Sequence, residues 1–231
     1  MIVSAPSAGQ PASPLPGLPP KPRLRGWIHF WSFPVAVVAG AVLISLSWIT
    51  ASGRVAAATA VYSVTVCALF GVSALYHRRN WANMAAYTWM RRLDHSMIFL
   101  FIAGTYTPFA LLAMEPETGT RVLAVVWGGA LAGVTLKMAW PSAPRWLGVP
   151  IYVALGWVAV FVLPELLHNA GPVVLGLLLA GGILYTLGGV FYALRWPNPW
   201  PRVFGFHEFF HTATVLAALC HHVAVWLVLY R

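Results

Sequence analysis

Two histidines, His207 and His211, stand four residues apart in the string His-Glu-Phe-Phe-His. On a helix this spacing places both imidazoles on one face, one turn apart, and such a pair suits coordination of a single Zn²⁺. The alternative is a histidine pair that is hydrogen-bonded inside a helical bundle. His77 is the candidate for a third nitrogen ligand. Three protein ligands leave a fourth position for water, which is typical of a catalytic zinc site rather than a closed structural one.

Two further polar residues, Asp94 and Ser73, are candidates for the same site. Asp94 is expected either as a fourth ligand or as the general base that orients a water molecule. Its alternative role is a salt bridge to Arg91 or Arg92 at a helix start, where a carboxylate also suits the helix dipole. Ser73 lies one helical turn before His77, so its hydroxyl could bond to that water or to a developing oxyanion. Alternatively, it bonds back to a carbonyl of its own helix.

The composition predicts that these residues lie in a membrane. The residues AVILMFWYC make up 60% of the 231 positions and charged residues 8%, and the mean hydropathy is +0.76. Soluble domains carry about 25% charged residues, and disordered chains are poor in apolar ones, so both classes are excluded. Two cysteines exclude a disulfide framework. The net charge of +9 comes from basic residues between apolar stretches, which fits loops beside anionic phospholipid and not a nucleic-acid-binding surface.

The chain divides into a tail and one membrane domain. Residues 1–25 hold seven of the eighteen prolines, and we expect a disordered, Pro-rich cytoplasmic tail there. Residues 26–231 contain seven apolar stretches of about the 20 residues that a bilayer crossing requires. The predicted fold class is therefore an all-α integral membrane protein, a seven-transmembrane helix bundle. The predicted spans are 30–50, 55–77, 93–114, 121–140, 147–164, 171–194 and 204–230.

The basic residues predict the orientation of this multi-pass protein in the cell membrane. With the N-terminus inside, three basic residues lie outside, namely Arg54, Arg121 and Arg231, and eleven lie inside. Those eleven are Lys21, Arg23, Arg25, Arg78, Arg79, Arg91, Arg92, Lys137, Arg145, Arg195 and Arg202. We therefore expect the N-terminus inside and the C-terminus outside. In this topology His77, Asp94, His207 and His211 all lie near the inner face, although they are up to 134 residues apart in sequence.

Glu208 completes the string H-E-x-x-H, in which soluble metalloproteases use the glutamate as a general base. A five-residue match on a membrane helix is weak evidence for an intramembrane metalloprotease. The string lies on the last predicted helix, and the best acidic partner for the histidines is the distant Asp94. We therefore expect no direct catalytic role for Glu208.

His95 follows Asp94 and is a candidate for a residue that supports the site, whereas the remaining histidines are expected outside it. His221 and His222 follow His211 by ten and eleven residues, which is about 15 Å along a helix and too far for the same ion. We expect His221 to form a hydrogen bond within the bundle. His29 and His168 are expected at the membrane borders, in contact with water.

Together, these strings resemble the hemolysin III branch of the progestin-and-adipoQ-receptor family, the adiponectin-receptor-like proteins. The similarity spans about residues 26–231 in the order of the family, whereas the Arg78-Arg79-Asn80-Trp81 turn is more basic than the family pattern. The matching strings are Ser73-Ala-Leu-Tyr-His77, Leu93-Asp-His-Ser96 with Ala103-Gly-Thr-Tyr-Thr-Pro108, Gly182-Ile-Leu-Tyr-Thr186 with Phe191-Tyr192, and His207-Glu-Phe-Phe-His211 followed by His221.

The resemblance implies roles for five residues. It implies that His77, His207 and His211 are zinc ligands, that Asp94 is the carboxylate that holds water, and that Ser73 supplies a hydroxyl. It also implies an intramembrane zinc protein similar to adiponectin receptors, in which zinc and a lipid cavity are associated with ceramide amide hydrolysis. Bacterial members of the family are linked to membrane-lipid homeostasis.

Three functional hypotheses follow. The first is a zinc-dependent hydrolase of a lipid amide or ester, with membrane lipids as its partners and substrate. The second is a non-enzymatic sensor or receptor of the membrane state, in which zinc ties two helices together. The third is a cytolytic hemolysin, which we favour least because the chain is typical of a resident multi-pass protein with no water-soluble form to secrete.

Overall fold

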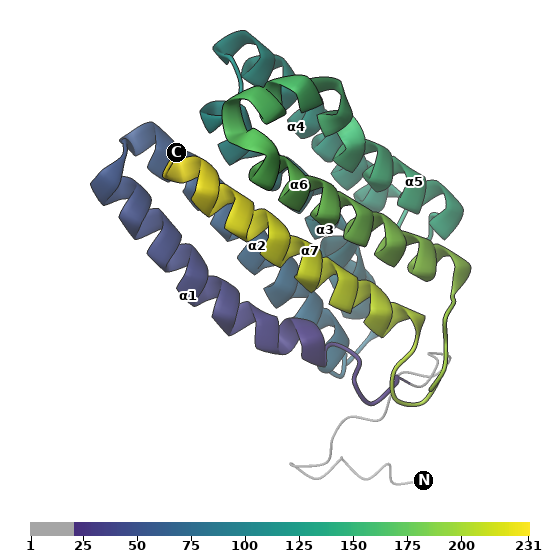
Figure 1. Ribbon diagram of the computed structural model, residues 1–231. Coiled ribbons are helices and arrows are strands. Elements are labelled where there is room, and N and C mark those ends of the chain that lie inside the picture. The colour runs from purple at the N-terminus through teal and green to yellow at the C-terminus, as the bar shows by residue number, and fades with distance from the viewer. Residues whose placement is uncertain (1–20) are drawn as a thin grey trace, which may run out of the picture.

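The fold is a bundle of helices, seen in a computed structural model that describes residues 21–231. Most of the tail predicted over 1–25 lies outside the described residues. All elements of the described part are helical (Figure 1). They are α1 (Trp27–Thr50), α2 (Gly53–Arg78), α3 (Met84–Leu112), α4 (Pro116–Ala139), α5 (Arg145–Gly156), the 3₁₀ helix η1 (Trp157–Val162), α6 (Leu163–Leu194) and α7 (Phe206–Leu229).

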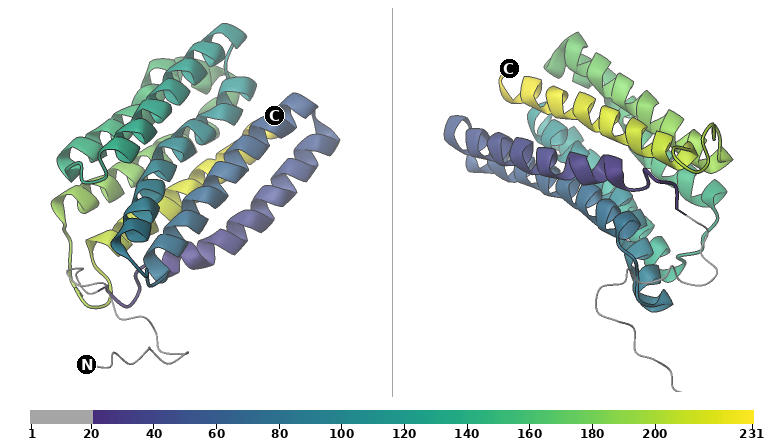
Figure 2. Two further views of the ribbon diagram at one scale, coloured as in Figure 1. Left: turned by 180° about the vertical axis from the view of Figure 1, so that it is seen from behind. Right: turned by 90° about the horizontal axis from the view of Figure 1, so that it is seen from below.

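The helices pack in chain order and close into a ring. Each α-helix contacts the next one, and α7 returns to contact α1. The helix α3 also contacts α5 and α7, and it is the most buried of the candidate membrane spans. Figure 2 shows the same arrangement from behind and from below. We call the end that holds the start of α1, the end of α2 and the start of α7 the proximal end, and the opposite end, where the C-terminus lies, the distal end (Figure 1).

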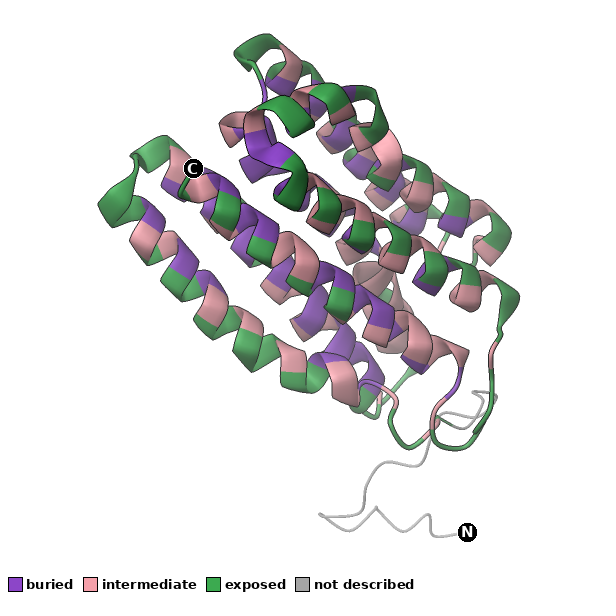
Figure 3. Cartoon of the chain, viewed as in Figure 1, coloured by how far each residue is buried: buried purple, intermediate pink, exposed green. Residues whose placement is uncertain are grey.

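The outside of the bundle is apolar, as a membrane protein requires. Exposed positions cover the outward faces of the helices (Figure 3), and large apolar side chains occupy many of them. Trp48 is 70% exposed, Ile49 is 75% exposed and Phe161 is 86% exposed. Water would disfavour such a surface, whereas hydrocarbon accepts it because the helices satisfy their own backbone groups. The chain is therefore a multi-pass membrane protein.

Within residues 21–231, six helices are long and apolar enough to cross a membrane, against seven predicted stretches. The difference lies in Arg145–Leu194, where the predicted fifth and sixth stretches belong to one continuous helical segment of 50 residues. That segment is broken at Gly171, whose φ of 82° and ψ of 171° are not helical. Pro172 follows at once, and its ring disfavours a helical conformation for the residue before it. The part of α6 after this break lies beside α5 (Figure 1).

The start of α3 was predicted too late. The helix begins at Met84, not near residue 93, because the side chain of Asn83 caps it by accepting a hydrogen bond from Ala86 N at 2.9 Å. Arg91 and Arg92 therefore lie within α3 and not in a turn. Hydropathy located the apolar part of this helix and missed its polar first turns.

Glycines permit close contacts between helices. Gly129 and Gly133 lie one turn apart on α4, as expected from their spacing, and both face other helices. A methyl group at Gly133 would overlap the ring of Phe99 on α3, and one at Gly129 would lie 2.6 Å from Leu155 Cδ1 on α5. The ring of Phe99 is fully buried, so it has little room to move.

This packing predicts opposite effects for the same substitution at two positions of α4. We expect Gly133→Ala to lower the free energy of unfolding by about 1–3 kcal/mol, the usual cost of overpacking a core. Gly128→Ala is the control, because no neighbouring atom in the described part lies within 4 Å of its added methyl. It should be neutral or stabilising by up to about 1 kcal/mol, since alanine favours helix. Thermal unfolding in detergent measures both, and equal effects would contradict the contact.

Candidate metal centre

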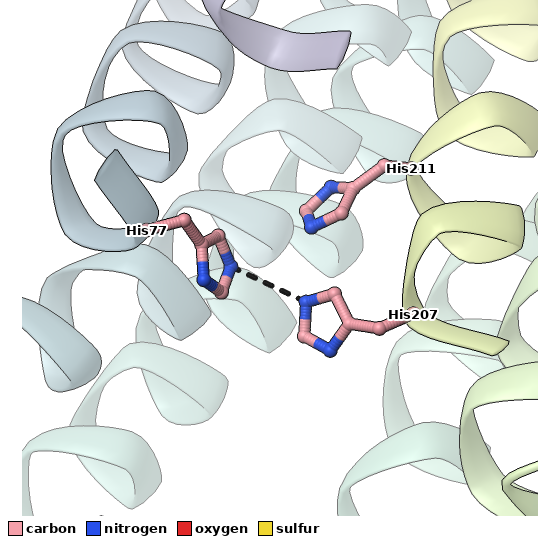
Figure 4. Close-up of side chains that lie close together, drawn as sticks. All are labelled: His77, His207 and His211. Carbon is pink, nitrogen blue, oxygen red and sulfur yellow. Dashed lines mark hydrogen bonds between the residues drawn. The ribbon is translucent and has the colours of Figure 1, made fainter. Parts of the chain in front are cut away.

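Three imidazoles from two helices converge at the proximal end (Figure 4). His77 comes from the last turn of α2, and His207 and His211 come from the first two turns of α7. One ligand atom from each ring lies within 4.8 Å of the others, and the Nε2 atoms of His77 and His207 are 3.2 Å apart. The structure thus brings together the histidine pair and the distant third histidine proposed from the sequence.

The donor atoms fit a metal ion. Nδ1 of His211 lies 3.1 Å from Nε2 of His29, while Nε2 of His211 is buried and has no hydrogen-bond partner within residues 21–231. A buried imidazole nitrogen without a partner is costly, and imidazole nitrogens are common ligands of transition metals. These three histidines could therefore bind one metal ion.

His29 belongs to this cluster, and its predicted position at a water-exposed membrane border is wrong. Its side chain is 2% exposed, and it faces His211 from the first turn of α1. The chain reaches this position because Gly26 takes a φ of +81° and lets α1 begin against α2, where a Cβ on Gly26 would lie 2.7 Å from Cβ of His77. The signal in the sequence was that His29 starts a helix at the same end as His77.

Asp94 and Ser73 lie beside the histidines. Oδ2 of Asp94 is 4.0 Å from Nε2 of His77, and the alternative salt bridge to Arg91 or Arg92 is not formed in the described part of the chain. Oγ of Ser73 is buried and has no hydrogen-bond partner among the described residues, so the alternative bond to its own helix is not made either. Both side chains line the same cavity as the three histidines.

Glu208 lines the same cavity as the histidines, but its carboxylate has structural partners. Its Oε1 accepts a 2.6 Å hydrogen bond from Nε of Arg25, and its Oε2 accepts a 2.9 Å bond from the backbone N–H of Gly205. Both oxygens are therefore occupied in a side chain that is 1% exposed. Within the H-E-x-x-H string, Glu208 therefore caps the start of α7 and pairs with Arg25, while the two histidines belong to the cluster.

His95 lines the same cavity as the cluster, whereas the three other histidines are placed apart from it. His221 lies with Nε2 3.3 Å from the carbonyl oxygen of Leu178, in agreement with the expected hydrogen bond within the bundle. Nε2 of His222 accepts a 3.0 Å hydrogen bond from Nε1 of Trp226. His168 is exposed, as predicted.

A large cavity opens beside the histidine cluster. Its volume is about 970 Å³, near the upper end of the ~300–1,000 Å³ that is usual for ligand sites. Polar and charged side chains line it at the proximal end, whereas farther along the bundle its walls are mostly apolar and aromatic. Those walls include Ile98, Phe101, Ile102, Phe109, Met114 and Leu166.

Comparisons with known proteins place this chain among membrane proteins of one family. Residues 19–222 match the family profile described as Haemolysin-III related. Hemolysin-3 of Bacillus cereus is 34% identical over 132 residues, which cover 57% of this chain and 59% of that protein. The monocyte to macrophage differentiation factor of Homo sapiens is 26% identical over 174 residues, 74% of this chain and 70% of the relative.

A plant relative extends the comparison. The heptahelical transmembrane protein ADIPOR2 of Oryza sativa is 28% identical over 180 residues, 71% of this chain and 79% of the relative. The match to the bacterial Hemolysin-3 relatives spans little more than half of their length, at 59% and 54%.

The geometry predicts graded losses of bound metal. We expect the wild type to copurify with about one metal ion per chain. His77→Ala, His207→Ala and His211→Ala should each lose most of it, because each removes one candidate ligand nitrogen. His29→Ala should weaken metal binding by about 10–100-fold without abolishing it, the usual effect of losing a residue that orients a ligand. His168→Ala is the control and should bind like the wild type.

Elemental analysis and competition with a chelator measure this series. Metal loss should also lower the unfolding temperature, since a ligand bound to the folded state stabilises it by mass action. Full metal content in the His211→Ala protein would refute the assignment of the ligands.

Proposed function

We propose that this chain, which belongs to the Haemolysin-III-related family, is a zinc-dependent hydrolase of an amide or ester bond in a membrane lipid. The observation that carries this proposal is the position of the histidine cluster, with Asp94 and Ser73, at the polar end of a cavity with largely apolar walls. A lipid has the same division, with its hydrolysable bond between a polar headgroup and long acyl chains.

The chain offers nitrogen ligands of the kind that zinc prefers. His77, His207 and His211 would hold the ion. Zinc bound by three histidines supplies Lewis-acid chemistry, which polarises a carbonyl oxygen and lowers the pKa of water. His29 would keep the ring of His211 in one orientation through the contact between their nitrogens.

Asp94 would accept a proton, and Ser73 would stabilise the negative charge that develops during the reaction. A carboxylate oxygen of Asp94 would take the proton from the attacking water, as a positioned general base. The free hydroxyl of Ser73 would donate a hydrogen bond to the oxygen of the scissile carbonyl as it gains charge. The apolar walls would hold the acyl chain and exclude bulk water.

A seven-span topology, with the N-terminus inside and the C-terminus outside, belongs to the same proposal. The break at Gly171 supports two passes within Arg145–Leu194. Two plant relatives carry the word heptahelical in their names, which also supports seven spans. The excess of basic residues at the proximal end supports the placement of this end, and with it the histidine cluster, at the inner membrane face.

A reporter fused after Arg231 tests this topology. It should be active only outside the cytoplasm, because an odd number of spans separates the two termini. A second reporter, fused in the loop at Asn198, should be active only inside. Cytoplasmic activity of the reporter at Arg231 would overturn either the number of spans or the orientation.

A non-enzymatic sensor is the second candidate. The contact between His77 and His207 joins α2 to α7, so a bound ion could stabilise the bundle without turnover. A wild-type protein that holds zinc and hydrolyses none of a broad panel of lipid amides and esters would favour this function, provided that its deletion alters membrane fluidity. The chain's multi-pass structure gives no support to a secreted cytolysin.

Asp94→Asn separates catalysis from a structural role. The substitution keeps the size of the side chain and removes the base, so fatty-acid release should fall by about 10²-fold or more while zinc is retained. Glu117→Gln, an exposed acid at the distal end, is the control and should keep full activity. Release of fatty acid by purified protein from a panel of lipid amides and esters, with and without a phosphate in the headgroup, is the measurement.

Two other outcomes would change the assignment. If Asp94→Asn loses zinc together with activity, Asp94 is a ligand and the base lies elsewhere. If Glu208→Gln is the inactive variant and Asp94→Asn is active, the metalloprotease interpretation of the H-E-x-x-H string gains support.

A further inference from the structure

Lys137 is a buried cation with no counter-ion. It lies in the last turn of α4, it is 8% exposed, and it lines the large cavity. Its ammonium group packs against α5, where a Cβ on Gly148 would lie 2.6 Å from Nζ. The described residues provide this ammonium with neither a hydrogen bond nor an ion pair. A cation that is largely enclosed by protein favours an anion as its partner.

Two guanidinium groups line the same part of the cavity. Arg91 reaches it from α3, and Arg145 reaches it from the first position of α5. Nε of Arg91 and Nη1 of Arg145 are both buried without a hydrogen-bond partner in the described chain. The guanidinium of Arg145 lies over the ring of Tyr192, 4.5 Å from its centroid, which holds it in place. His95 on α3 lines the same cavity.

The acids of the cavity do not neutralise these cations. Asp94 faces His77, and Glu208 is paired with Arg25. The first turn of α5 begins at Arg145 without a side-chain cap, and the helix dipole there also favours an anion. Farther along the proximal end, burial and the charges of Arg25 and Arg78 lower the pKa of Lys21. The local surplus of positive charge is therefore large.

We propose that Lys137, Arg91 and Arg145 form a binding site for the phosphate of an anionic lipid headgroup, on the wall of the cavity made by α3, α4 and α5. Guanidinium groups bind phosphate through paired N–H bonds, and an ammonium adds a compact charge. The apolar length of the cavity would take the acyl chains, which distinguishes a lipid from free phosphate. This inference rests on the proposed function in placing a lipid in the cavity, and it names the substrate class as a phosphate-bearing lipid.

Lipid binding to the full chain in detergent tests the site. Phosphatidic acid and diacylglycerol with the same acyl chains, which differ only in the phosphate, are titrated separately, and the bound lipid is counted by native mass spectrometry. We expect the wild type to bind the anionic lipid about tenfold more tightly, the scale of one or two charge-assisted hydrogen bonds. Inorganic phosphate should displace it only weakly, because it lacks the acyl chains.

Three variants assign the preference to the cluster. Lys137→Gln should reduce the preference to about twofold or less, and Lys137→Arg should retain most of it. Arg202→Gln is the matched control, because it removes one exposed charge at the same end outside the cavity. Its preference should equal that of the wild type. Unfolding temperature and zinc content show whether each variant is folded.

The two proposals fail in different ways. Equal binding of the two lipids by the wild type would overturn the phosphate site, and so would an undiminished preference in folded Lys137→Gln. Displacement by inorganic phosphate at the concentration at which the lipid binds would show an anion site that does not select lipid. Hydrolysis is measured in parallel, so a preference for the anionic lipid without turnover would leave the phosphate site standing and reject only the hydrolase.

Discussion

The contact between the end of α2 and the start of α7 is the interaction on which the rest of the structure depends. Imidazoles cannot lie in hydrocarbon without partners, so His77, His207 and His211 must face each other inside the bundle. Their meeting fixes the relative position of two helices that are distant in sequence. His29 then brings the first turn of α1 to the same point. Three of the helices are thereby held at their proximal ends.

The segment before α1 reinforces this contact. Nζ of Lys21 donates to the carbonyl oxygen of His77 at 3.1 Å, and Arg25 pairs with Glu208. The backbone N–H of Arg23 donates to the carbonyl of Arg202 at 3.0 Å, which joins the segment to the loop before α7. These bonds place positive charge around the opening of the cavity, while its interior stays apolar. The cavity is thus polar and positively charged at one end and mostly apolar at the other. The proposed lipid hydrolase and the proposed phosphate site both rest on this difference.

The sequence predicted those features of the site that follow from helical spacing or from depth in the membrane. The pair His207 and His211 followed from helical spacing, and His77 was linked to it because the predicted topology gave all three one depth. Depth alone does not show which side of a helix faces the bundle. His29 was therefore misplaced at a water-exposed border, although it lies at the same end.

Other features depend on contacts that no local pattern contains. The position of Glu208 is set by Arg25, 183 residues away, and the cation cluster forms only when α3, α4 and α5 meet. The early start of α3 was missed because its first turns are polar. The helical conformation of Pro164 and Glu165 was missed for a different reason, since these residues resemble a loop but are tolerated in the first turn of α6.

The origin of the ligands in α2 and α7 has a consequence for biogenesis. A membrane protein is inserted from its N-terminus as it is synthesised, and α7 is the final helix of the described chain. His77 therefore enters the bilayer well before its two partner histidines exist. A metal ion held by all three histidines would bind only after the last helix has docked, so its binding would report that assembly is complete. A chain stalled before this step would expose an unpaired polar group, which cellular quality control could recognise.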